Sequence, residues 1–79
     1  MKPSDINIGQ VVYAIFRKYG KHYLYGLVEE KSYNEHGLDG WWISILPTAN
    51  PKHDPHIEYQ IQNRIRLLIP LKDILETID

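Results

Sequence analysis

The chain has 79 residues, a formal net charge of −1 and no cysteine, and 43% of its residues are hydrophobic. This apolar content excludes a disordered chain, and the length predicts a single domain over residues 1–79. The near-neutral charge is not that of a general nucleic-acid binder, and the absence of cysteine excludes disulfides and thiolate metal centres.

The start of the chain carries no targeting signal that we recognise. Residues 1–5 are polar and include Pro3, and no stretch of the chain approaches the ~20 apolar residues of a membrane span. We therefore expect a cytoplasmic protein with no membrane partner.

Two strands joined by a tight turn are expected in the first part of the chain. Residues 10–17 are β-branched and aromatic on both faces, so both faces of this strand need cover. Gly20 provides the turn because glycine readily takes positive φ, and a second strand follows from His22 to Glu30. Gly26 predicts a bend or a close backbone approach within that second strand.

A third strand, from Trp41 to Leu46, is expected between two loops. The turn-rich segment 32–40 precedes it, and residues 47–55 contain three prolines, which predicts an extended surface loop. Beyond this loop, the apolar and polar residues of 57–62 alternate, as in a half-buried strand. Periodicity leaves open whether residues 57–69 form one bent strand or a hairpin.

The end of the chain has the apolar spacing of a helix. From Pro70 onward, apolar residues recur at i, i+3, i+4 and i+7, which predicts about two helical turns covering the core. Together these elements predict a mainly β fold, a small barrel of five to six antiparallel strands with a short C-terminal helical turn.

Two short motifs resemble a known class of domain. Gly9 to Ala14 has the form Gly-x-x-Val-x-Ala, and Ile69 to Ile74 is similar to a Val-Pro-Leu-x-Asp-Leu closing segment. In both motifs the chain resembles the small SH3-like barrels, Tudor-type domains among them. The resemblance implies a binding module that uses aromatic residues to hold peptides, modified lysine or arginine side chains, or nucleic acid.

Aromatic residues are the main candidates for partner binding. Neighbouring strand residues face opposite sides, so at most one of Trp41 and Trp42 fills the core, and we expect Trp41, beside the Gly40 turn, to be exposed. Tyr23 and Tyr25 share a face and meet Tyr13 across the hairpin. The alternatives are that these rings pack under a loop, stiffen the sheet or mediate self-association. The candidate partner-binding residues are Tyr13, Tyr23, Tyr25, Trp41 and Trp42.

A basic and aromatic turn gives an alternative function. Single-stranded nucleic acid needs cations for its phosphates and rings on which its bases stack. The residues at this turn that meet the requirement are Arg17, Lys18, Tyr19, Lys21 and His22. A hairpin turn is also ordinarily solvated by charged residues, whatever its role.

Metal binding and catalysis have weaker sequence signals. His53, Asp54 and His56, with His36 elsewhere, lie in or near a proline-bounded loop that offers two ligands at most, so neither a metal site nor a cofactor is expected. No nucleophile with partnered His and Asp and no glycine-rich phosphate loop is found, so no catalytic residue is assigned.

Three functions therefore stand as hypotheses. The first is a non-enzymatic module that recognises a protein or peptide, with a homodimer left open. The second is a nucleic-acid-binding barrel that uses the basic hairpin. The third is an oligomeric enzyme with its site at a symmetry axis, similar to the type II dihydrofolate reductases, which the short barrel and the Gly-x-x-Val opening resemble.

Overall fold

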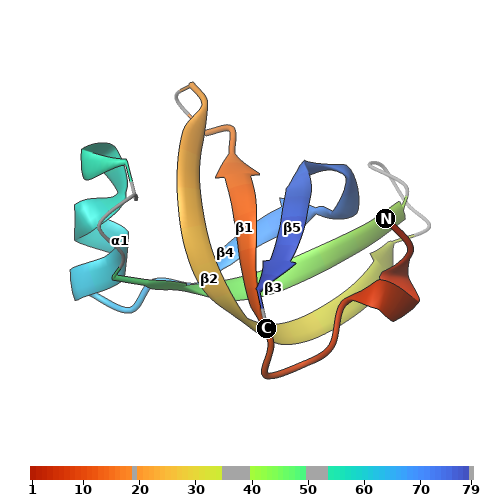
Figure 1. Cartoon of the computed structure of the whole chain (residues 1–79). Helices are drawn as coiled ribbons and strands as arrows, with labels where there is room; N and C mark the ends of the chain where they lie inside the picture. Colours follow the sequence, from red (N-terminus) through yellow and green to blue (C-terminus); the bar gives the residue numbers. More distant parts are fainter. Residues whose placement is uncertain (19, 35–39, 50–53, 79) are drawn as a thin grey trace.

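Five antiparallel strands form one sheet in the computed structural model, which describes residues 1–18, 20–34, 40–49 and 54–78 (Figure 1). The spatial order is β4-β3-β2-β1-β5. The strands are β1 (Val11–Phe16), β2 (His22–Asn34), β3 (Gly40–Thr48), β4 (Leu67–Pro70) and β5 (Ile74–Ile78). The prediction of a mainly β fold is confirmed.

Short helical segments connect the strands. The single α-helix of the described segments, α1 (Glu58–Gln62), directly follows the 3-10 turn η2 (Pro55–Ile57). Two further 3-10 turns are η1 (Pro3–Asp5) and η3 (Leu71–Asp73). Across the described ranges, no helix has the length and apolar character needed to cross a bilayer.

The sheet is curved but open. The long strands β2 and β3 bend so that β4, at one edge, passes close to β1 across the core (Figure 1). The three residues of η3 carry the chain from the β4 edge to the β5 edge, and the sheet order places no pairing between these two strands. The prediction of a barrel is therefore wrong in one respect, because the sheet does not close between β4 and β5.

The core lies inside the curve and is built from alternate strand residues. One buried side chain from the N-terminal segment, Ile6, and one from η2, Ile57, complete it. The strand residues of the core are Val12, Ala14, Leu24, Val28, Ile43, Ile45, Leu67, Ile69 and Ile74.

Gly20 behaves as the sequence predicts, and Gly26 does so only in part. Gly20 has a φ of 113°, which is the left-handed conformation expected at the turn. At Gly26, a Cβ atom would lie 2.7 Å from Cδ1 of Ile45, so the close neighbour is a core side chain and not the backbone that the sequence predicts. Ile45 reaches Gly26 because it lies two residues from Pro47, the partner of Gly26 in the β2–β3 ladder, and so on the same face of β3.

The predicted strand at 57–62 is wrong, since these residues form η2 and α1. Ile57 and Ile61 are four positions apart, and this spacing fits one helix face as well as one strand face. Tyr59 distinguishes the two, because a strand would turn it inward with Ile57, whereas it is 66% exposed. Asp54 caps the segment by accepting a hydrogen bond from the backbone N–H of His56. Within 57–69 only residues 67–69, the first part of β4, are strand, so these residues form neither one bent strand nor a hairpin.

The predicted two-turn helix at the C-terminus is also wrong. Only η3 is helical, and residues 74–78 form β5, which pairs with β1 from Ile78 opposite Val11 to Ile74 opposite Ala14. Residues 74–78 form a strand because the edge of β1 that does not pair with β2 offers them backbone hydrogen bonds, which a helix would leave unused. The loops predicted at 32–40 and 47–55 are wrong at their ends, because β2 extends to Asn34 and β3 includes Gly40, Pro47 and Thr48, whereas residues 35–39 and 50–53 lie outside the described residues.

Candidate functional site

Three of the predicted aromatic residues meet on the outer face of the sheet. Tyr13 lies opposite Tyr25 in the β1–β2 ladder, and their ring centroids are 4.8 Å apart. The Tyr13 and Tyr23 rings stack at 6.0 Å with an interplanar angle of 22°. Their strand neighbours Ala14 and Leu24 are buried on the other side, so the rings point away from the core. We call Tyr13, Tyr23 and Tyr25 the tyrosine face.

Aliphatic side chains extend the tyrosine face along the same side of the sheet. A row of register-matched, partly exposed residues crosses four strands, and no described helix or strand lies over this side in Figure 1. The row consists of Ile78, Val11, Leu27 and Leu46. The surface is thus a continuous apolar platform with tyrosine hydroxyls on it.

Glu76 adds a negative charge to this surface, because it lies opposite Tyr13 in the β1–β5 ladder. Burial raises the pKa of the Tyr13 hydroxyl above its ordinary value, and the charges of Tyr25, Tyr23 and Glu76 raise it further. The hydroxyl of Tyr13 therefore stays protonated and can donate a hydrogen bond at neutral pH.

The tyrosine face is a platform and not an aromatic cage. A cage needs rings that meet at steep angles around a void that admits a cation. Here the rings contact one another directly, with interplanar angles of 22° and 41°.

The two tryptophans lie away from the tyrosine face. Trp41 is the more exposed of the two, at 36%, and its ring contacts Tyr33 edge-on with a centroid distance of 5.5 Å. It lies seven positions along β3 from Thr48, the partner of Tyr25, which corresponds to about 23 Å. Trp42 is half-buried opposite Pro70 and lines a shallow hollow of about 350 Å³ together with Ile15 and Leu68. The five predicted aromatic residues therefore do not form one surface.

The residues of the basic turn are partly engaged with acids. Arg17 Nε donates to Oδ1 of the buried Asp73 at 3.0 Å, and His22 is bonded to Asp54. Lys21 is exposed, and Tyr19 lies outside the described residues. Two of the five residues predicted for nucleic-acid binding, Arg17 and His22, are therefore paired with acids.

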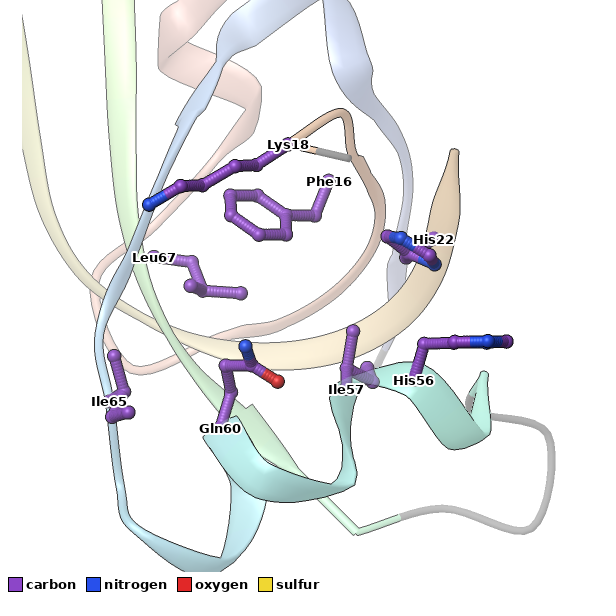
Figure 2. A pocket seen from close by; sticks show the side chains of 8 residues that line it. All are labelled: Phe16, Lys18, His22, His56, Ile57, Gln60, Ile65 and Leu67. Atoms are coloured by element: carbon purple, nitrogen blue, oxygen red, sulfur yellow. The ribbon is translucent and has the colours of Figure 1, made fainter. Parts of the chain in front are cut away.

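A pocket that the sequence reasoning missed lies between the end of the β1–β2 hairpin and the η2–α1 segment (Figure 2). Its volume is about 220 Å³. The buried Oε1 of Gln60 has no hydrogen-bond partner among the described residues. The lining residues are Phe16, Lys18, His22, His56, Ile57, Gln60, Ile65 and Leu67. Sequence reasoning missed this pocket because it expected a strand where the helix forms one wall.

A cluster of two imidazoles and one carboxylate lies beside this pocket. His22 Nδ1 is 3.0 Å from Oδ2 of Asp54, and His56 Nδ1 is 2.8 Å from Oδ1. The backbone N–H of His56 and the two imidazoles hold the pKa of the Asp54 carboxyl well below its usual range. The cluster thus places an ionised carboxylate between two histidines that are 34 residues apart in sequence. His36 and His53, which the sequence analysis also considered, lie outside the described residues.

Comparisons of this chain with protein-family models, with curated proteins and with solved structures found no match. Its function is therefore inferred from its own geometry.

Proposed function

We propose that this chain is a non-enzymatic binding module that recognises a protein or peptide through the tyrosine face. The observation that carries this proposal is the direct contact of Tyr13, Tyr23 and Tyr25 on the outer side of the sheet, next to an aliphatic row. Contiguous apolar surface of this kind is a feature of interaction sites.

Tyrosines suit this role for a physical reason. Each ring offers a large apolar area and loses little conformational entropy on binding, and its hydroxyl supplies a directed polar contact. The exposed Glu76 beside Tyr13 favours a cation. The partner we propose is a polypeptide segment with apolar side chains and a lysine or arginine that pairs with Glu76.

The resemblance to SH3-like and Tudor-type barrels supports a binding role at the level of the fold. The five antiparallel strands are compatible with that resemblance, although the sheet is open. Binding at the tyrosine face would use the outer side of β1 and β2.

A peptide-display selection on the wild-type chain tests the proposal. We expect the enriched peptides to combine aliphatic or aromatic residues with a lysine or arginine. The double change Tyr23→Ser and Tyr25→Ser should weaken their binding by at least about tenfold, as expected when interface aromatic residues are lost. The matched control is Tyr59→Ser, because Tyr59 is more exposed than either ring and lies on α1.

Two results would contradict the proposal once circular dichroism shows that the variants fold. In the first, the selected peptides bind the double variant and the control equally well. In the second, the wild type is a dimer that the double variant converts to monomers, which would assign the tyrosine face to self-association.

A further inference from the structure

The cluster beside the pocket is held by a rigid local frame. The backbone N–H of Asp54 donates to the carbonyl oxygen of Tyr23 at 3.1 Å, which fixes Asp54 against β2 next to His22. On its other side Asp54 accepts the N–H of His56 at 2.9 Å. His22 and Tyr23 project to opposite faces of β2, so this cluster is separate from the tyrosine face.

The spacing of the three side chains is close to that of a metal centre. One ligand atom from each of His22, Asp54 and His56 can be chosen so that all three lie within 4.8 Å of one another. In a tetrahedral zinc site, bonds of about 2.0–2.2 Å place the ligand atoms about 3.3 Å apart. The two nitrogen–oxygen distances, 3.0 Å to Oδ2 and 2.8 Å to Oδ1 of Asp54, are those of hydrogen bonds that zinc coordination would replace. To bind one ion, the two imidazoles must also move closer to each other. The side chain of His56 has room for this movement because it is 77% exposed.

From this geometry we infer that His22, Asp54 and His56 form a zinc-binding site. Imidazole nitrogens suit zinc and related transition metals, whereas magnesium and calcium take oxygen ligands. Three protein ligands leave a fourth position for water.

The charges around the cluster favour a cation. The Asp54 carboxylate contributes a full negative charge, and zinc binds imidazole through a nitrogen that carries no proton. Among the described residues that line the adjacent pocket, Lys18 is the one lysine or arginine, and Figure 2 shows its ammonium group on the far side of the pocket from the two histidines. Bound zinc would link the start of β2 to the beginning of η2, and so stabilise the segment that carries α1.

Calorimetric titration of the full chain with zinc chloride tests the inference. We expect one site, together with a rise in the thermal unfolding midpoint that magnesium does not produce. Asp54→Asn should weaken zinc binding by at least about tenfold. Loss of a group that only hydrogen-bonds to a metal ligand already costs about this much, and loss of a ligand should cost more. Asparagine is as good a helix cap as aspartate, so this variant retains the local fold. His56→Gln should have the same effect, and Glu76→Gln is the matched control for loss of a carboxylate.

The inference is overturned if the wild type binds no zinc, or if binding survives both Asp54→Asn and His56→Gln. NMR of the wild type makes the test independent of folded variants. On addition of zinc, the imidazole resonances of His22 and His56 should shift most, and unchanged resonances for these two rings would also overturn the inference.

Discussion

At the scale of single residues, the absence of a side chain at Gly26 shapes the sheet. The side chain of Ile45 occupies the space where a Cβ would lie, and both residues are buried. Three atoms of Ile45 lie between 2.7 and 3.1 Å from that position. Any side chain at Gly26 would therefore displace a core residue.

We predict that Gly26→Ala destabilises the fold by about 1–3 kcal/mol, the usual cost of overpacking a core. Chemical denaturation measures the free energy of unfolding. In an Ile45→Val background, which removes the nearest methyl group, the same change should cost less. Equal costs in the two backgrounds would show that the contact with Ile45 is not the cause.

At the scale of elements, the η2–α1 segment explains how a strand pattern can belong to a helix. Alternation of apolar residues at i, i+2 and i+4 includes the i, i+4 pair of a helix, so Ile57 and Ile61 pack inward in either conformation. The N-cap at Asp54 and the proline at the first helical position favour the helix. The helix then forms one wall of the pocket.

Substitutions in the η2–α1 segment should show whether it is a helix or a strand. We predict that Ile57→Ala costs about 2–5 kcal/mol, because Ile57 is fully buried in the core. Tyr59→Ala should change the free energy of unfolding by less than about 0.5 kcal/mol, as is usual for an exposed residue. A half-buried strand would instead make both changes costly, and thermal or denaturant unfolding of the two variants decides between them.

At the scale of the whole molecule, features that depend on neighbouring residues could be predicted from the sequence, whereas features that depend on contacts between distant residues could not. The β1–β2 hairpin followed from residues next to each other, namely the turn at Gly20 and the apolar runs beside it. The strand β5 did not, because its pairing with β1 joins residues 60 or more positions apart, such as Val11 and Ile78. The tyrosine cluster was predicted from the hairpin alone. The pocket was missed, and the sequence named Asp54 and His56 as candidate ligands without His22, since the pocket and the complete cluster exist only once η2 packs against the start of β2.

One ion pair connects the distant parts of the fold and gives the last prediction. Arg17, which follows β1, donates to Asp73 in η3, 56 residues away, at the turn that joins the two sheet edges. The Asp73 side chain is only 4% exposed, so Arg17→Ala would leave a buried acid without this partner. We predict a loss of about 1–3 kcal/mol in the free energy of unfolding, the desolvation cost of a buried group left unpaired.

A different arginine–carboxylate ion pair, between Arg66 and Glu29, provides a matched control for this prediction. Its arginine side chain is 67% exposed and its acid is more exposed than Asp73, so Arg66→Ala should have a much smaller effect. Combining Arg17→Ala with Asp73→Asn should recover part of the loss, because no buried charge then remains. If denaturation gives the two single arginine variants equal stabilities, the link between β1 and η3 does not stabilise the fold in the way that its burial indicates.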